Sequence, residues 1–485
     1  MHEDLRRRAL ESGKTVSKKA ISKQSSRGSS RANSAANSRA ASRAQSREVS
    51  DDEDPGNGNL SDDTTQSINS IDALLESEDF NEQTTDATRE QLNSTIDDLL
   101  ERKGSSSKSR EESLTSYVRC LTSHYLAEVL HGRVSNILDA LGRSVKAETS
   151  EREATLALRA IAVTAITFAD DRIYETVQSL LKRTATDSQS LEVKTAAIHA
   201  WGICLSFGGA GEDEIADAMT IFLEIASSDG AFVGADDSAE VVAAALHTYG
   251  FLATEVEDLE HESEDAISTF LDQLDADDVR VQVAAGENIA LLYEKSYTPR
   301  EEGESGSSSS PSSEEEEEEG ETVGQETREP DTSGLIKRYN AYHNSKEVLE
   351  KVKGLAGLST KSMNRRDKKL LHQTFASVLM TVEQPQRGLQ SNSTTKKVVR
   401  IHREGEMRVD KWWKLIRLTT IRRLLGGGFV NHYFEGNKQV LNALPMIMRG
   451  TDQGGLQSPR KSLHKASKGR YRDTRRFISA DAPEE

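Results

Sequence analysis

The stretch that decides the fold is Val279-Arg-Val-Gln-Val-Ala-Ala-Gly-Glu-Asn-Ile-Ala-Leu-Leu-Tyr293. From Val283 onward it is apolar most of the way round a helix, which is typical of a helix buried on several sides. Asp277 and Asp278 precede it, and acidic or capping side chains in a first turn complement the positive end of a helix. Small residues such as Gly286 would let neighbouring helices approach closely. We therefore expect an inner, buried helix here.

Three earlier segments begin in the same way, which indicates a repeat. They are Ser150-Glu-Arg-Glu-Ala154, Ser190-Leu-Glu-Val193 and Ser238-Ala-Glu-Val241. Their apolar runs start at Ala154, Val193 and Val241, and together with Val279 the successive starts lie 39, 48 and 38 residues apart. Amphipathic segments alternate with these runs. A helix-pair period of about 40–47 residues is typical of HEAT and armadillo repeats.

We therefore predict a mainly α fold, with an armadillo/HEAT-like α-solenoid of about five repeats over residues 88–298. Its first helix should carry Leu92, Ile96, Leu99 and Leu100. An irregular helical bundle is the competing interpretation, because the pattern of a single sequence identifies helices better than it identifies how they stack.

Charge is divided sharply along the chain. The 485 residues include 62 Lys and Arg against 80 Asp and Glu, a formal net charge of −18. Residues 1–47 hold 12 basic and 3 acidic residues, residues 48–333 hold 19 and 64, and residues 334–485 hold 31 and 13. The net charges of the three blocks are thus +9, −45 and +18. An acidic body between two basic ends indicates a polyanionic partner that the ends contact.

The first 87 residues are expected to be disordered. They are rich in Ser and Arg and then in acidic residues, with too few large apolar side chains to offset chain entropy. Within them, Arg-x-x-Ser spacing suits a basophilic kinase, and phosphorylation would cancel the local positive charge. The serines at that spacing are Ser30, Ser34, Ser42 and Ser46. A solvated tail without modification is the alternative, and nothing in the sequence separates the two.

Several protein classes are disfavoured by composition. Only two cysteines occur, Cys120 and Cys204, which cannot form a disulfide framework or a four-thiolate zinc site. The N-terminus has no apolar region of a secretory signal, and no window approaches the ~18 apolar residues of a membrane span. We expect a cytoplasmic protein, with the nucleus as a further location, no membrane partner and no cofactor.

Residues 299–333 are predicted to be an acidic, disordered linker. They include Pro311 and six consecutive glutamates, Glu314–Glu319, whose mutual repulsion favours an extended chain. Two roles stay open for this linker. It could be a plain spacer, or it could mimic a polyanion and occupy the basic C-terminal region.

Residues 334–450 are predicted to form a small basic α+β domain, followed by a basic tail over 451–485. Apolar residues at helical spacing, such as Val352 and Phe375, precede an alternation around Glu404-Gly405 that indicates a β-hairpin. Asp410 is a candidate N-cap for a helix over 411–425, which three glycines would end. A shorter helix should begin at Asn437 and stop before Pro445.

Catalysis has little support in the sequence. It contains no nucleophile-elbow, P-loop, Rossmann or kinase motif. Cys204 lies on an Ala-rich segment and is expected to be a buried structural thiol. His199 and His247 have no partners at metal-ligand spacing and are expected in the core or a groove. We predict a protein that is not an enzyme, with no catalytic residue, no metal and no small-molecule substrate.

Nucleic-acid binding has better support, because basic residues interleave with aromatics in the C-terminal region. Cations neutralise phosphates, and exposed aromatic rings stack on unpaired bases. The alternative is that a tryptophan packs the small core while the cations are only solvated. The candidate RNA-binding residues are Arg365, Arg366, Lys368, Lys369, Lys411, Trp412, Trp413, Lys414, Arg417, Arg422, Arg423, Arg460, Lys461, Lys465, Lys468, Arg470, Arg472, Arg475 and Arg476.

The sequence resembles the interferon-related developmental regulator family. The most specific similarity lies in Asn364-Arg-Arg-Asp-Lys-Lys369 with the Phe375–Glu383 run, in Val409-Asp-Lys-Trp412, and in Leu424-Leu-Gly-Gly-Gly-Phe-Val-Asn-His432 with Asn437. The solenoid matches more loosely, best over Val283–Leu292. The resemblance covers about residues 88–476. The Ser/Arg-rich start and the glutamate run depart from the family pattern.

The resemblance implies a non-enzymatic regulator of cytoplasm and nucleus. It implies a ribosome-associated translational regulator whose basic C-terminal region binds ribosomal RNA and sterically keeps ribosomes inactive. The alternative is a nuclear transcriptional co-regulator that uses the solenoid as a scaffold for chromatin or transcription regulators. The first hypothesis also agrees with the charge division, because the basic C-terminal block is suited to RNA.

Overall fold

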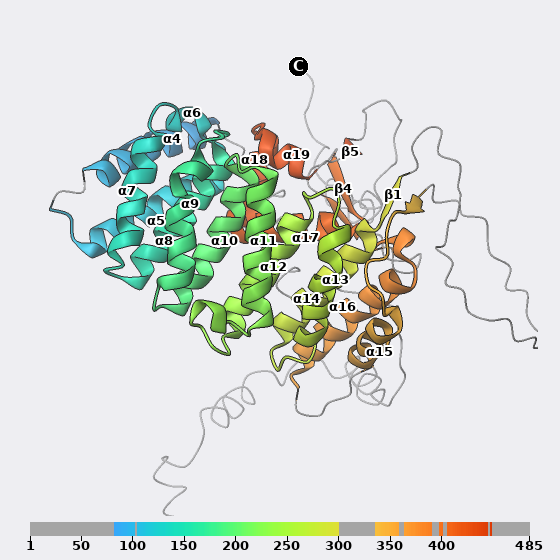
Figure 1. Cartoon of the computed structure of the whole chain (residues 1–485). Coiled ribbons are helices and arrows are strands. Elements are labelled where there is room, and N and C mark those ends of the chain that lie inside the picture. Colours follow the sequence, from blue (N-terminus) through green and yellow to red (C-terminus); the bar gives the residue numbers. More distant parts are fainter. Residues whose placement is uncertain are drawn as a thin grey trace, which may run out of the picture. The chain divides into compact units, whose positions relative to one another are not determined.

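The computed structural model describes residues 82–101, 104–299, 335–357, 363–389, 397–400, 405–444 and 447–448 (Figure 1). Several predictions fall outside these residues: the disordered start, most of the acidic linker and the basic tail. The candidate residues outside the described ranges are Ser30, Ser34, Ser42, Ser46, Arg460, Lys461, Lys465, Lys468, Arg470, Arg472, Arg475 and Arg476.

Paired helices follow one another from α4 to α14, as Figure 1 shows from blue to yellow. Five of them stack as an inner layer in which each contacts the next: α5 (Ser107–Ser123), α8 (Glu151–Thr167), α10 (Leu191–Phe207), α12 (Ala239–Ala253) and α14 (Val279–Lys295). The outer helices are α4 (Glu82–Leu100), α7 (Val134–Ala147), α9 (Ile173–Asp187), α11 (Glu212–Ser227) and α13 (Glu260–Gln273), with the short α6 (Ala127–Leu130) and η1 (Ala231–Val233) between them. The predicted α-solenoid is confirmed.

The inner helices begin where their capping residues predict. Ser150 accepts a hydrogen bond from the backbone N–H of Glu153, and Ser190 accepts one from Val193. Asp278 does the same for Arg280, whereas Ser238 occupies the cap position of α12 without a side-chain bond. Each such bond satisfies an otherwise unpaired N–H group and contributes about 1 kcal/mol.

The C-terminal region forms helices and a small sheet. The helices are α15 (Ser345–Ala356), α16 (Arg365–Glu383), α17 (Trp412–Leu425), α18 (Phe429–Phe434) and α19 (Lys438–Ala443), with the 3-10 turns η2 (Pro385–Arg387) and η3 (Gly426–Gly428). The strands β3 (Lys397–Arg400), β4 (Gly405–Val409) and β5 (Ile447–Met448) form an antiparallel sheet in the order β3-β4-β5. The predicted hairpin is confirmed, with Val399 opposite Met407.

A second, two-stranded sheet joins the ends of the predicted linker. Strand β1 (Tyr297–Pro299) pairs antiparallel with β2 (Leu335–Lys337), so that Pro299 lies opposite Leu335. This pairing cannot be predicted from the sequence pattern, because three-residue strands carry almost no periodic signal. The two ends of the linker are therefore held side by side.

The predicted N-cap at Asp410 is wrong by one residue. Lys411 occupies the cap position of α17 and makes no side-chain capping bond. Asp410 instead pairs with Lys414 at 2.6 Å, one helical turn away. The first N–H groups of α17 instead donate hydrogen bonds to the carboxylate of Glu294 in the solenoid.

The C-terminal helices pack on the solenoid as well as on each other. Helix α16 lies against α14, where Gly286 makes the contact possible: a Cβ atom there would lie 2.8 Å from Cε1 of Phe375. Helix α17 contacts α5, α8, α12 and α14. Core side chains from both regions belong to one continuous hydrophobic cluster. Among the described helices, none is long and apolar enough to cross a membrane.

Candidate nucleic-acid interface and its docking on the solenoid

The two adjacent tryptophans have different environments. Trp412 is 1% exposed, and its indole N–H donates to Oγ1 of Thr381 at 2.7 Å. The ring of Trp413 is partly buried, with Nζ of Lys414 5.4 Å and the guanidinium of Arg417 5.1 Å from its centroid. Trp412 is therefore the core residue of the pair. Only Trp413 retains an exposed portion that a base could contact.

A buried carboxylate holds the start of α17. Glu294, at the end of α14, is 5% exposed and accepts the backbone N–H of Trp412 at 3.0 Å and that of Trp413 at 3.5 Å. Burial raises the pKa of Glu294 to about 7, although the nearby charge of Lys411 and the two N–H groups act in the opposite direction. The solenoid thus supplies the capping acid that the local sequence of α17 lacks.

Arg417 connects the middle of α17 to the end of α12. Its guanidinium donates to Oγ1 of Thr254 at 2.8 Å and to the backbone oxygen of Thr254 at 3.0 Å. Lys295 donates to the carbonyl of Ala253 at 3.0 Å, so two cations meet the negative end of that helix. Burial lowers the pKa of Arg417, and it lowers the pKa of Lys295 to about 8. The sequence singled out Arg417 for RNA, yet its guanidinium is engaged by the solenoid.

The last two arginines of α17 differ in exposure. The guanidinium of Arg422 lies 5.3 Å from the ring centroid of Phe429, and burial lowers its pKa to about 10. Arg423 is exposed, although desolvation lowers its pKa as well. Among the described residues, its guanidinium forms no hydrogen bond or salt bridge. Arg423 is therefore the cation of this helix that is most accessible to a phosphate.

The first turn of α16 presents a second group of cations. Arg365 and Lys369 are exposed, and Lys368 is partly buried. The side chain of Arg366 lies outside the described residues. Lysines and arginines exposed on one helix turn can neutralise successive phosphates. This cluster and Arg423 are the candidates that the fold leaves open to solvent, whereas Trp412, Lys414, Arg417 and Arg422 also have partners inside the protein.

The glycine turn after α17 docks on the end of α5. A Cβ atom on Gly428 would lie 1.8 Å from the backbone oxygen of Thr122, so only glycine fits this approach. Asn431 donates to the carbonyl of Ser123 at 2.8 Å, and Nε2 of His432 lies 2.7 Å from that of Leu121. Burial lowers the pKa of His432 to about 4, which keeps the imidazole neutral.

Asn437 completes this docking contact. Its side-chain oxygen caps α19 by accepting the N–H groups of Gln439 and Val440, as predicted from the sequence. Its amide also donates to the backbone oxygen of Ile166 on α8 at 2.9 Å. The turn at Gly426–Gly428 and the cap at Asn437 agree with the sequence-based predictions. Their docking role leaves no local signal in the sequence, because the partner carbonyls lie some 270 to 310 residues earlier in the chain.

A cavity of about 210 Å³ lies between α17 and the inner helices α8, α10 and α12. His199 and His247 line it with their ring centroids 6.5 Å apart. Burial and the charge of Arg423 lower the pKa of His199 to about 3 and that of His247 well below its usual value. Both are therefore neutral groove residues, in agreement with one of the two predicted environments.

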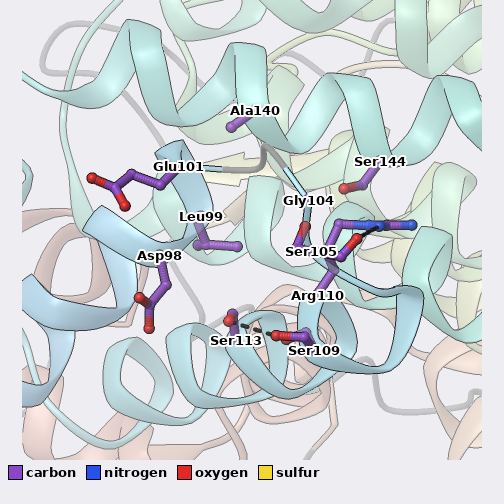
Figure 2. A pocket seen from close by; sticks show the side chains of 10 residues that line it. All are labelled: Asp98, Leu99, Glu101, Gly104, Ser105, Ser109, Arg110, Ser113, Ala140 and Ser144. Carbon is purple, nitrogen blue, oxygen red and sulfur yellow. Dashed lines mark hydrogen bonds between the residues drawn. The ribbon is translucent and has the colours of Figure 1, made fainter.

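Cys204 and Arg110, which lines a second cavity, both take part in the packing of the solenoid. Cys204 is fully buried, and desolvation raises its pKa to about 12, as expected for a structural thiol. Figure 2 shows the other cavity, about 310 Å³ between α4, α5 and α7. Arg110 lines it, but its guanidinium is bound to the buried Glu153 of α8 at 2.7 and 2.8 Å. This pair holds two inner helices together.

Comparisons with known proteins agree with the residues that suggested a family. The model of the interferon-related developmental regulator family matches residues 58–383. An uncharacterized protein of Schizosaccharomyces pombe is 30% identical over 351 residues, which are 71% of this chain and 72% of that protein. The family match ends at the last residue of α16, so the motifs around Trp412, Gly428 and Asn437 lie beyond it.

Proposed function

The chain belongs to the interferon-related developmental regulator family, and on this premise we propose that it is a non-enzymatic translational regulator. In this proposal the basic C-terminal region binds ribosomal RNA and keeps ribosomes inactive by occupying sites that tRNA or mRNA would use. The observation that carries it is the charge division: 31 basic and 13 acidic residues over 334–485, against 19 and 64 over 48–333. A polyanion would be attracted by the first block and repelled by the second.

The described residues support this arrangement through their docking contacts. Glu294, Arg417 and Gly428 hold the C-terminal helices on the solenoid, while Arg423, Arg365 and Lys369 are exposed. Docking of these helices on the solenoid lowers the entropic cost of RNA binding, because the cations are already positioned before the RNA binds. The eight basic residues of 460–476 would then add a segment that orders on RNA.

The two described cysteines are buried. Desolvation raises the pKa values of both Cys120 and Cys204, which disfavours their thiolate forms. His199 and His247 face each other in a largely apolar groove.

The test is salt-dependent co-sedimentation with ribosomes. The full chain should sediment with ribosomes at low salt and dissociate as salt rises. Reversing Arg470, Arg472, Arg475 and Arg476 to Glu should weaken binding and reduce the slope of log affinity against log salt by roughly 3, at ~0.7 per lost phosphate contact. The matched control is Arg183→Glu, an exposed charge on the outer helix α9. Equal sedimentation of the reversed and control variants would show that the tail is not the RNA-binding element.

A second candidate function is favoured by the open cavity against α8, α10 and α12. A solenoid with an accessible apolar groove can hold a protein partner. In this alternative the protein is a nuclear transcriptional co-regulator and its basic ends act in import. Immunoprecipitation from separated cytoplasm and nuclei distinguishes the two: recovery of ribosomal proteins supports the first function, and recovery of histone-modifying subunits supports the second.

A further inference from the structure

The groove beside α17 has an apolar floor and a cationic rim. Small side chains from the inner helices, including Ala162, Ala196 and Ala200, leave the cavity of about 210 Å³. Phe251 and Ile203 close its base. One leucine side chain has four carbon atoms and would fill roughly 120 Å³ if each occupied about the volume of a water molecule. The groove therefore has room for one or two aliphatic side chains.

Two arginines line this groove, and neither forms a salt bridge with an acidic side chain among the described residues. Arg159 donates one hydrogen bond to the backbone oxygen of Leu424 at 3.0 Å, and Arg423 makes none to any described residue. Desolvation lowers the pKa of Arg423, and the charge of Glu287 acts in the opposite direction. Both arginines are exposed residues, and desolvation also lowers the pKa of Arg159. The neutral His199 and His247 between them add no negative charge, so the groove suits an apolar side chain flanked by carboxylates.

One segment of the chain has this chemistry. Residues 61–81 contain six acidic residues and no Lys or Arg. Within them, the run Ile71-Asp-Ala-Leu-Leu-Glu76 places two leucines between two acidic residues that are four positions apart. Ile68 comes three positions before Ile71, which corresponds to one turn if the segment is helical. The family match over residues 58–383 includes this segment. No contact described above accounts for it.

The segment is also long enough. Six residues lie between Leu75 and Glu82 at the start of α4, and the seven steps from Leu75 to Glu82 allow about 23 Å when extended. Helix α4 packs on α5, and α5 packs on α8, whose Arg159 and Ala162 line the groove. Two helix spacings at 8–10 Å each amount to about 20 Å. Tethering this close to the groove raises the effective concentration of the segment to the millimolar range.

We propose that the groove formed by α8, α10, α12 and α17 binds the chain's own acidic segment Ser61–Asn81. Leu74 or Leu75 enters the cavity, and the carboxylates of Asp72 and Glu76 pair with Arg159 and Arg423. This contact is independent of RNA binding, so it can hold whether or not the proposed function is correct. It gives the acidic segment a specific site on the solenoid.

Photo-crosslinking in the full-length chain tests this contact. A photoreactive benzoylphenylalanine replaces Thr420, which lines the groove on α17, or Glu224 on the exposed face of α11 as the control. Mass spectrometry then maps the crosslinked peptides. Peptides from residues 61–81 should be enriched about tenfold at the groove position over the control position, the ratio expected for ~1.4 kcal/mol of preference.

Variants and labelling make the result decisive. The double variant Leu74→Glu, Leu75→Glu should remove the enrichment and leave the circular dichroism spectrum unchanged, and Arg423→Glu should reduce the enrichment severalfold. An equal mixture of isotope-labelled and unlabelled chains identifies whose segment is bound. Crosslinks within one chain support the proposal. Crosslinks between chains, enrichment that survives Leu74→Glu with Leu75→Glu, or no enrichment over Glu224 would overturn it.

Discussion

The solenoid and the C-terminal region are stabilised in different ways. In the solenoid, every inner helix except α12 is capped by the side chain of the residue that directly precedes it, as with Ser150 and Ser190, and the inner helices pack on one another in chain order. In the C-terminal region, the start of α17 is capped by Glu294, more than a hundred residues earlier, and its end is fixed by the close approach of Gly428 to Thr122. Capping by residues adjacent in the chain is thus sufficient for helices of the solenoid, whereas α17 of the C-terminal region depends on contacts with the solenoid.

This difference decides the role of the basic residues. A basic side chain of the C-terminal region can either bind the solenoid or face solvent. The spacing of basic residues in the sequence does not distinguish these two environments. Arg417 and Arg423 lie on the same helix, yet the first binds the end of α12 and the second lines an open groove. Substitutions at residues that bind the solenoid, compared with substitutions at solvent-exposed residues, therefore test the difference between the two regions.

The largest effect is expected from Gly428→Ala. The added Cβ would collide with the backbone of Thr122, which cannot move away as a flexible side chain could. Undocking should lower the free energy of unfolding by about 3 kcal/mol or more, the upper range for overpacked sites. Thermal unfolding monitored by circular dichroism measures this loss. The matched control is Gly354→Ala on α15, where nothing lies within 4 Å, and alanine there should stabilise by about 0.5–1 kcal/mol.

The next effect is a pH dependence that originates at Glu294. Its pKa is raised to about 7 in the folded protein, so the folded state binds a proton between about pH 4.5 and 7 that the unfolded state releases. The resulting stabilisation is present below pH 4.5 and is lost as the pH rises through 7, with an amplitude of up to about 3 kcal/mol. Urea unfolding at several pH values should show this decrease in the wild type and lack it in Glu294→Gln. An identical pH profile in both proteins would contradict the assignment.

A smaller effect separates two arginines of α17. Arg417→Ala removes the hydrogen bonds to Thr254 and should cost about 2 kcal/mol of stability, since bonds to charged groups contribute about 1.5–3 kcal/mol. Arg423→Ala should change stability by less than about 0.5 kcal/mol, as expected for an exposed side chain. Denaturant midpoints compare the two variants. Equal losses would mean that Arg423 also serves docking.

The smallest effect is expected inside the solenoid. Ser190→Ala removes one capping bond to the N–H of Val193 and should cost about 1 kcal/mol. The loss should stay local, with faster amide hydrogen exchange in the first turn of α10 and unchanged exchange in α17. Faster exchange in α17 would show that the solenoid and the docked helices open together.

The same distinction explains what the sequence could predict. The alternation of buried and amphipathic helices, the starts near Ser150, Ser190 and Asp278, and the cap at Asn437 all depend on neighbours in the chain, and each was predicted. The cap of α17 was assigned to Asp410 because the nearest acid was the only local choice, and a distant acid takes that position instead.

The candidate interface was predicted less completely, because the partners of several of its side chains are distant in the sequence. Basic residues beside aromatics indicated a nucleic-acid surface, but the side chains that the solenoid binds cannot be recognised without its coordinates. The indole N–H of Trp412 donates to Thr381, and the guanidinium of Arg417 donates to Thr254. Both side chains therefore face the protein interior. Arg365 and Lys369 remain exposed at the start of α16.

The most direct measurement is a cryo-electron microscopy map of the full-length protein purified with ribosomes from its native cells. The account predicts density for the C-terminal residues, including the exposed cations of α16 and the segment 460–476, against ribosomal RNA in a tRNA or mRNA site. The acidic solenoid should lie away from the RNA phosphates. A complex in which the solenoid contacts the ribosome and the C-terminal cations face solvent would contradict the proposed function.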